Sequence, residues 1–291
     1  MRPVVVSTIA ATRQHVTHAR HRGLSIGLVP TMGALHAGHA RLIRDARAET
    51  DYVVVSIFVN PTQFGPHEDL DRYPRTPERD VQLCAQEGVD LIFHPEVAEM
   101  YPPGFQTYVE VTELQRGLCG ASRPGHFRGV ATVVTKLLNI VQPDVAYFGQ
   151  KDAQQARLVQ QLVADLNIPV RIRVCPIVRE ADGLALSSRN QYLSPTQRRQ
   201  AVVLSRALQA AATHVEAGER DAAALRRILA EHLRQAPDLR LDYAEVVDAD
   251  TLQPVTTLRG RTLIALAAWL GTTRLIDNVI VEAEPGPRPA A

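Results

Sequence analysis

Short apolar segments alternate with helical patterns through the first 180 residues of the chain. Strands are predicted at residues 4–6, 25–29, 52–59, 90–94, 145–148 and 170–175, because these segments are short, apolar and rich in β-branched side chains. Helices are predicted between them, at residues 9–22, 38–49, 78–87, 130–141 and 153–166. This β-α-β repetition predicts an α/β fold with a doubly wound, Rossmann-like parallel sheet, whose ligands lie beyond the carboxyl ends of the strands.

The pattern changes after residue 180. Two Ala-rich helices are predicted at residues 195–217 and 221–235, followed by strands at residues 241–247, 262–268 and 277–282. The sequence therefore predicts a large domain over residues 1–180 and a smaller α+β domain over residues 181–283. Residues 180–183 are predicted to form a hinge that lets the smaller domain close over the larger one, and the Pro-rich tail, residues 284–291, is predicted to be disordered.

Composition narrows the range of partners. An apolar content of 45% is sufficient for a large core, and a formal net charge of +1 argues against a broad basic surface for duplex nucleic acid. No window approaches the roughly 20 apolar residues that a membrane-spanning helix needs. Cys84, Cys119 and Cys175 are far apart and form no C-x-x-C pair, which is typical of reduced, structural thiols in a cytosol. We expect a soluble, cytoplasmic protein with neither a nucleic-acid partner nor a membrane partner.

A turn with two histidines follows the strand predicted at residues 25–29. The segment from Val29 to His39 reads V-P-T-M-G-A-L-H-A-G-H and leads into a predicted helix. Gly33 and Gly38 permit close backbone approach, and the helix start offers N–H groups and a positive dipole end to an anion. His36 and His39 can donate hydrogen bonds to a triphosphate. Structural histidines and a metal-binding pair are the alternatives, and metal is disfavoured because no cysteine or third histidine is nearby.

The few lysines of the chain also indicate a phosphate-binding site. The chain has only two lysines, Lys136 and Lys151, and its other side-chain cations are mostly arginines. A lysine is a compact point charge that can move between phosphate oxygens, whereas arginine presents a wide planar fork. Because Lys151 follows the strand predicted at residues 145–148, it lies at the edge of the sheet where ligands are expected. Lys136 lies on an otherwise apolar helix face, which is also typical of a lysine whose stem is buried.

Five sequence blocks resemble a known family. They are PTMGALH at residues 30–36, SIFVNPTQF at 56–64, SRPGHFRGV at 122–130, FGQKD at 148–152 and SSRN at 187–190. The H-x-G-H pattern is a mark of nucleotidyltransferases, and the five blocks together resemble the pantothenate synthetase (pantoate–β-alanine ligase) family along nearly the whole chain. The resemblance implies an ATP-dependent ligase that condenses pantoate with β-alanine to give pantothenate, AMP and pyrophosphate through an enzyme-bound pantoyl adenylate. It also implies Mg²⁺ with ATP as co-substrate, and a homodimer formed through the large domain.

The resemblance assigns roles to individual residues. Those implied to balance charge on the phosphates are His36, His39, Lys151, Ser187, Ser188 and Arg189. Those implied to bind ATP are Pro30, Met32, Gly38, His39, Gly149, Lys151, Asp152, Val178, Ser187, Ser188 and Arg189. Pantoate is implied to be held by Asn60, Gln63 and Gln155, and neutral amides suit a small polar substrate. Further site residues implied are Tyr73, Arg123, His126 and Lys136, with Asp80 as a contact of Mg²⁺.

Two positions depart from the family pattern, and several of the candidate residues could have a purely structural role. Arg79 stands where relatives carry the acidic partner of Asp80, and Gln150 stands where most relatives carry Glu. Asn60 before a proline is also typical of a turn. The cluster of Arg123, His126 and Arg128 is predicted to lie on a Gly- and Pro-containing loop, which is also typical of a solvated surface, and Asp152 suits the cap of the helix that follows it.

Other functions share part of the pattern. A cytidylyl- or adenylyltransferase that keeps the nucleotide on its product has the same H-x-G-H turn, and a nucleotide-sensing module would bind ATP without releasing pyrophosphate. A fragment of an aminoacyl-tRNA synthetase is disfavoured, because the chain lacks a basic surface of tRNA size and the length for an anticodon domain. In the ligase interpretation, closure of the smaller domain is expected to shield the adenylate from water.

Overall fold

The computed structural model describes residues 2–66 and 68–283, and the predicted disorder of residues 284–291 lies outside them. Over the described residues the chain divides into two compact units. The first unit comprises the residues up to 115, 123–150 and 155–178. The second comprises residues 116–122, 151–154 and those from 179 onward. Two short segments from the middle of the chain therefore group with the C-terminal unit.

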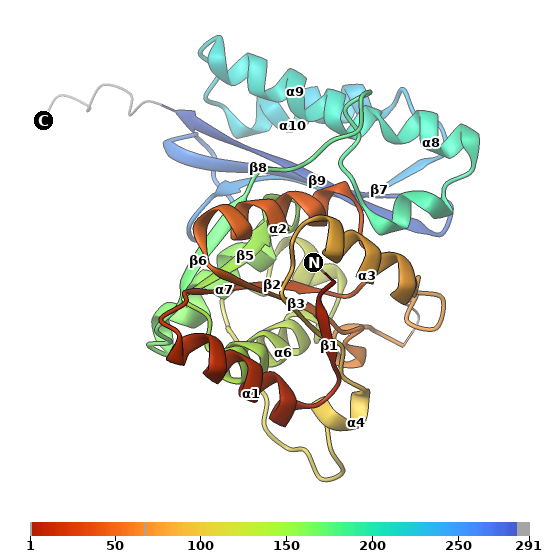
Figure 1. The fold of residues 1–291 in the computed structure, drawn as a ribbon. Helices are drawn as coiled ribbons and strands as arrows, with labels where there is room; N and C mark the ends of the chain where they lie inside the picture. The colour runs from red at the N-terminus through yellow and green to blue at the C-terminus, as the bar shows by residue number, and fades with distance from the viewer. Residues whose placement is uncertain (1, 67, 284–291) are drawn as a thin grey trace, which may run out of the picture. The chain divides into compact units, whose positions relative to one another are not determined.

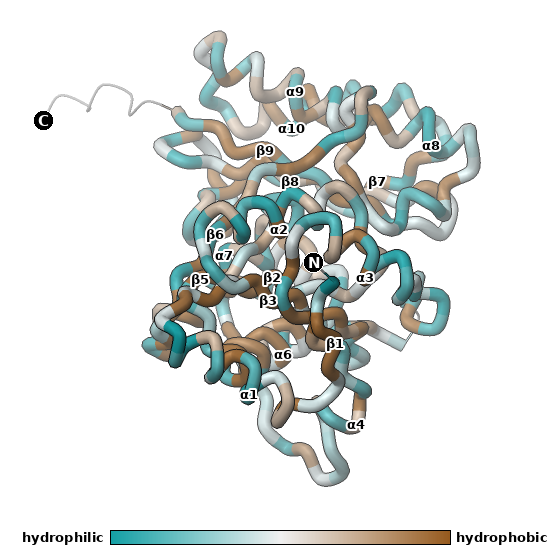
Figure 2. Tube along the Cα trace, in the orientation of Figure 1, coloured by the Kyte–Doolittle hydropathy of each residue, from teal (hydrophilic) through white to brown (hydrophobic). Residues whose placement is uncertain are grey.

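Six parallel strands form the sheet of the first unit, within the described residues. Their spatial order is β1 (Val4–Val6), β4 (Leu91–Phe93), β3 (Tyr52–Ile57), β2 (Ile26–Thr31), β5 (Val145–Gly149) and β6 (Arg171–Cys175). Helices cover both faces, so the central strands β2 and β3 are buried almost throughout. Figure 2 shows apolar residues along these strands, while the outer helix α3 is mostly hydrophilic. The predicted doubly wound, Rossmann-like sheet is confirmed.

The helices of the first unit lie in two layers (Figure 1). On one face α1 (Ile9–His21) contacts α6 (His126–Val141), and on the other α2 (Ala37–Glu49) contacts α3 (Pro77–Gln86). The connection from β5 to β6 runs through α7 (Ala153–Asp165), after the short η2 (Gln150–Asp152). Short helices also occur at η1 (Pro61–Gln63) and α4 (Val97–Met100). Within residues 2–66 and 68–283, every helix is too short or too polar to cross a bilayer.

The strand ends bring distant segments together. Thr31, the last residue of β2, pairs with Ile57, the last residue of β3. On its other side β2 pairs with β5. Because all three strands are parallel, the loops that follow them lie at the same edge of the sheet. The loop after β2 carries the two histidines, and the loop after β3 carries Asn60 and Gln63.

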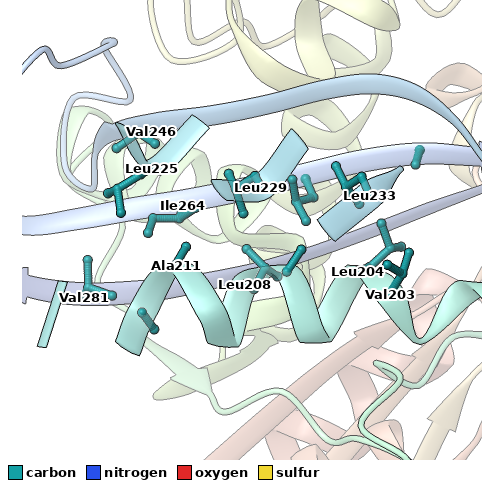
Figure 3. Close-up of a cluster of buried hydrophobic side chains, with 14 of the residues drawn as sticks. Val203, Leu204, Leu208, Ala211, Leu225, Leu229, Leu233, Val246, Ile264 and Val281 are labelled. Atoms are coloured by element: carbon teal, nitrogen blue, oxygen red, sulfur yellow. The ribbon is translucent and has the colours of Figure 1, made fainter. Parts of the chain in front are cut away.

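The second unit is a small α+β structure. Its antiparallel sheet has the order β7 (Leu239–Asp248), β8 (Gly260–Leu270) and β9 (Thr273–Ala283). Helices α9 (Val203–Glu216) and α10 (Ala222–Leu233) pack against each other and on this sheet. Figure 3 shows Leu208 of α9 and Leu229 of α10 pointing into the apolar layer that Ile264 and Val281 contribute from the strands. Further helical segments of this unit include α5 (Leu118–Ser122), η3 (Ser188–Tyr192) and α8 (Pro195–Ala201).

Two sequence-based predictions of helices are wrong. The single helix predicted at residues 195–217 is interrupted at Val202, which separates α8 from α9. Val202 keeps right-handed helical angles (φ −61°, ψ −21°), and the side chains of Val202 and Val203 are both buried at this interruption. Helix α6 starts at His126 and not at residue 130, because Gly125 adopts a left-handed conformation (φ 80°) that ends the preceding loop. His126 and Arg128 are therefore helical and do not lie on a loop.

The three cysteines are buried and unpaired, in agreement with their prediction as structural thiols. Burial raises the pKa of Cys84 to about 12, with a smaller contribution from the charge of Asp80. Burial likewise raises the pKa of Cys175 to about 12. Thiols with such pKa values stay protonated near neutral pH and are poor nucleophiles.

Truncation of Leu229 should destabilise the second unit. Its side chain is fully buried between α10 and the sheet, so Leu229→Ala should cost about 2–5 kcal/mol of unfolding free energy. The matched control is Leu241→Ala, the same truncation at a residue of β7 that is 42% exposed, which should cost less than about 1 kcal/mol. Urea unfolding followed by the fluorescence of Trp269, in β8, measures both variants. Equal losses in the two variants would contradict this core assignment.

Candidate active site

A left-handed turn links β2 to α2. Gly33 (φ 84°) and Ala34 (φ 50°) both have positive φ and direct the chain from the strand end into the helix. The Thr31 hydroxyl donates to the carbonyl of Ser56 in β3 (2.8 Å) and accepts from the N–H of Gly33 (3.3 Å). A Cβ on Gly33 would lie 3.0 Å from a carboxylate oxygen of Asp80. Glycine is therefore favoured at residue 33 by both the backbone angle and the space.

The two histidines cap α2 and contact each other. The Nδ1 atom of His36 accepts the N–H of Gly38 (3.1 Å), and the Nδ1 atom of His39 accepts the N–H of His36 (3.3 Å). The imidazole ring centroids are 4.2 Å apart. A backbone N–H can only donate, so each Nδ1 presents its lone pair. The neutral imidazoles therefore carry their protons on Nε2, and each offers an Nε2–H donor.

Asp80 lies under this turn. Its side chain is 1% exposed, and its two oxygens accept the N–H groups of Ala34 (3.0 Å) and Leu35 (2.8 Å). The prediction that Asp80 contacts Mg²⁺ stays a prediction, and the structure shows a different use of the carboxylate. Among the described residues, no group of three or more His, Cys, Asp or Glu side chains is arranged to hold a metal ion.

Neutral amides gather at the end of β3. Asn60 is 1% exposed, and its Nδ2 donates to the Gln63 Oε1 (3.0 Å) and to the carbonyl of Gly129 (3.1 Å). The Gln63 Nε2 in turn lies 3.0 Å from the sulfur of Met32, which follows β2. Residues predicted for pantoate and for ATP thus meet in the first unit. Gly129 permits this arrangement, because a Cβ there would lie 2.3 Å from the backbone oxygen of Thr62.

Tyr101 belongs to this cluster and was not predicted from the sequence. Its hydroxyl donates to the Asn60 Oδ1 (2.9 Å), so the amide of Asn60 is fixed from both ends. The ammonium of Lys136 lies over the rings of Phe105 (4.8 Å) and Tyr101 (5.7 Å). Burial lowers the pKa of Lys136. Lys136 is therefore connected to the amide cluster through Tyr101, and its helix position alone did not indicate this.

Arg123 and His126 hold the backbone of Gln63. Arg123 pairs with Glu68, with an Nε–Oε1 distance of 2.7 Å, and donates to the Nε2 of His126 (3.1 Å). The Nδ1–H of His126 then donates to the carbonyl of Gln63 (2.8 Å). Burial raises the pKa of Glu68, but the hydrogen bond and charge of Arg123 outweigh burial and leave this pKa lowered. Tyr73, also predicted for the site, is buried and packs edge-on against Phe64 (5.8 Å).

The remaining predicted residues are divided between the two units. Gly149, Gln155 and Val178 belong to the first unit, whereas Lys151, Asp152, Ser187, Ser188 and Arg189 belong to the second. Within the second unit, the carbonyl of Lys151 accepts a hydrogen bond from the side chain of Asn278 in β9 (3.0 Å). The Lys151 ammonium lies 3.8 Å from the Asp152 carboxylate. The Ser187 hydroxyl caps η3 by accepting the N–H of Arg189 (3.3 Å). The convergence of Lys151 with the two histidines stays a prediction.

Comparison with known proteins identifies the family. The model of the Pantoate-beta-alanine ligase family matches residues 4–280. A pantothenate synthetase of Moorella thermoacetica is 60% identical over 278 residues, which cover 96% of this chain and 98% of that protein. The chain belongs to the pantoate–β-alanine ligase family. It is an enzyme of that family, as its sequence motifs predict.

Solved structures of the family share the fold. The crystal structure of pantothenate synthetase from Thermus thermophilus aligns with a TM-score of 0.91 and 48% identity, and covers 96% of this chain and 99% of that one. A pantoate–β-alanine ligase from Francisella tularensis, crystallised in complex with beta-gamma ATP and β-alanine, aligns with a TM-score of 0.78 and 36% identity. That alignment covers 96% of this chain and 97% of the Francisella chain.

The hydrogen bonds at His36 and His39 predict one tautomer for both imidazoles. We expect long-range ¹H–¹⁵N correlation spectra of the neutral rings to show protonated Nε2 and unprotonated Nδ1, because backbone N–H groups point at both Nδ1 atoms. His18, an exposed histidine of α1, should instead show both tautomers in exchange and serves as the internal control. A proton on Nδ1 of either neutral imidazole would be incompatible with the capping geometry.

Proposed function

We propose that this chain condenses pantoate with β-alanine in an ATP-dependent reaction that proceeds through an enzyme-bound pantoyl adenylate. One observation carries the proposal. A turn with two imidazole donors and a cluster of neutral amides follow β2 and β3, two strands that pair along their whole length. The turn suits a phosphate group, and the amides suit a small polar acid, so both reactants of an adenylation step can be held at one edge of the sheet.

An activated intermediate is required by the chemistry. A carboxylate does not react usefully with an amine in neutral water, because the leaving group would be oxide. In the proposed first step, a carboxylate oxygen of pantoate attacks the α-phosphorus of ATP and pyrophosphate leaves. In the second step, the free amine of β-alanine attacks the acyl carbon, AMP leaves and the amine proton is lost to solvent. The protein contributes positioning and charge stabilisation.

The histidines are suited to the first step as neutral donors. Their Nε2–H groups are proposed to hydrogen-bond phosphate oxygens, on which negative charge increases as the bond to pyrophosphate breaks. A fixed donor that requires no reorganisation during the reaction stabilises such charge effectively. The other nitrogen of each ring is held by the backbone, so each ring is oriented before ATP binds.

Asn60 and Gln63, with Gln155, are proposed to bind pantoate. Asn60 makes hydrogen bonds to its neighbours at both ends of its amide, which fixes its orientation. Neutral amides can hydrogen-bond the hydroxyl groups of pantoate and leave its carboxylate unpaired. An unpaired carboxylate is the better nucleophile, whereas an arginine at this position would hold the charge in a salt bridge.

The second unit is proposed to complete the ATP site. Lys151, Ser187, Ser188 and Arg189 would contribute positive charge and hydroxyl donors to the phosphates, with Asp152 at the nucleotide. Because Asn278 anchors the backbone of Lys151 to β9, Lys151 would move together with this unit. Closure of the unit would also protect the mixed anhydride from hydrolysis.

Other parts of the proposal rest on the family. The Francisella relative binds beta-gamma ATP and β-alanine, and we propose the same two ligand classes here. We propose that Mg²⁺ enters as the Mg·ATP complex, because this ion prefers phosphate oxygens and water to a dedicated protein cage. We further propose a cytoplasmic homodimer formed through the first unit.

Isotope exchange tests the adenylate. The protein with Mg·ATP and pantoate, without β-alanine, should incorporate labelled pyrophosphate into ATP, because formation of the adenylate is reversible. Omission of pantoate is the control and should abolish the exchange. If product forms in the complete reaction but no exchange occurs at any pantoate concentration, the adenylate route is rejected. Product that retains a nucleotidyl group, without free AMP, would instead identify a nucleotidyltransferase.

Replacement of Lys151 tests whether its compact ammonium group stabilises the phosphates in the transition state. Lys151→Ala should lower kcat about 100- to 1000-fold, or about 2.7–4 kcal/mol, the scale for loss of one donor to the transition state. Lys151→Arg keeps the charge but replaces a point charge with a planar fork, so it should restore only part of the rate. Steady-state kinetics with all three substrates measure both variants. A Lys151→Ala variant of near-normal rate would remove this residue from the site.

A further inference from the structure

Asp80 makes its closest contacts with the turn that carries the histidines. It lies in the first turn of α3, 1% exposed, and its Oδ2 accepts the N–H of Ala34 (3.0 Å). Its Oδ1 accepts the N–H of Leu35 (2.8 Å) and the hydroxyl of Thr76 (3.0 Å). Two of these three donors are therefore consecutive backbone N–H groups from a loop that is 45 residues away in sequence.

The turn has the geometry of an anion-binding nest. Gly33 and Ala34 have positive φ, and the two N–H groups that follow converge on one carboxylate. For alanine a left-handed conformation costs about 1–2 kcal/mol, so it persists only where the surroundings compensate. A buried carboxylate without hydrogen-bond donors is also unfavourable. The turn and Asp80 therefore stabilise each other.

We propose that Asp80 is a positioning residue: it locks the turn so that His36 and His39 present their Nε2–H donors to the triphosphate. This inference rests on the proposed function, because it assumes that the turn binds ATP. The N–H groups of Ala34 and Leu35 are occupied by Asp80, and those of His36 and Gly38 by the imidazole Nδ1 atoms, so the imidazole Nε2–H groups are the donors proposed for phosphate. The carboxylate of Asp80 is stabilised by hydrogen bonds from neutral groups of the protein before ATP binds.

The alternative role is a direct contact with Mg²⁺, and the two roles differ in their dependence on the metal. A positioning residue acts on ATP whether or not Mg²⁺ is present, because its partners are backbone groups. A metal contact acts only on the Mg·ATP complex. A purely structural residue would change the fraction of folded protein but not the affinity of the folded molecules.

The decisive experiment is calorimetric titration of Asp80→Asn with ATP, once with Mg²⁺ and once with EDTA. The amide keeps the size of the side chain but turns one acceptor into a donor that faces an N–H group. We expect the Kd for ATP to rise about tenfold under both conditions, with unchanged stoichiometry. The matched control is Glu78→Gln, the same chemical change at an exposed residue of the same helix, which should leave the Kd unchanged within about twofold.

Three results would overturn the proposal. These are an unchanged Kd, a rise only in the presence of Mg²⁺, and a lower stoichiometry without a change in Kd. If Asp80→Asn does not fold, Thr76→Val decides the question, because it removes one donor to Asp80 and keeps the carboxylate. It should raise the Kd about two- to threefold under both conditions, and an unchanged Kd would count against the proposal. Because binding is measured without turnover, a wild-type protein that binds ATP but shows no pyrophosphate exchange would reject the proposed function alone.

Discussion

The hydrogen bonds inside the turn after β2 fix the orientation of the two histidines that we propose bind the phosphates of ATP. Thr31 is tied to β3, the N–H groups of Ala34 and Leu35 to Asp80, and each histidine Nδ1 to a backbone N–H. These bonds make the Nε2–H groups of the histidines directed, neutral donors. Catalysis by preorganised donors depends on such fixation, because a group that must reorient during the reaction loses most of its electrostatic effect.

The amide cluster after β3 is also held in place by hydrogen bonds. Asn60 is held by Tyr101 and by Gly129 of α6, and the backbone of Gln63 is held by His126. Arg123 forms an ion pair with Glu68 and also contacts the imidazole of His126, which orients this ring toward Gln63. The charged side chain of Arg123, paired with Glu68, therefore contacts the backbone and the imidazole that support the cluster. The side chains proposed to bind pantoate are neutral amides. In the proposed site, these neutral amides would leave the carboxylate of pantoate available for attack.

The sequence predicted the architecture well because buried parallel strands must be apolar on both faces. Strands β2, β3 and β5 are such segments, and the turn residues between elements marked most boundaries. The start of α6 at His126 had no clear signal in the sequence, because glycine is only modestly enriched just before helices. The break at Val202 was missed because apolar periodicity continues through it. The candidate residues of the site were identified from motifs, whereas the contacts that hold them in place were not. Asp80 meets Leu35 across 45 positions and Tyr101 meets Asn60 across 41, and no local pattern encodes such contacts.

A crystal structure of the protein with Mg·ATP and pantoate would show directly whether one site holds both ligands. We expect the Nε2 atoms of His36 and His39 and the Nζ of Lys151 to lie about 2.7–3.2 Å from oxygens of the same triphosphate, with pantoate hydrogen-bonded to Asn60 and Gln63. A triphosphate bound away from the turn after β2, or pantoate held by other residues, would contradict this expectation.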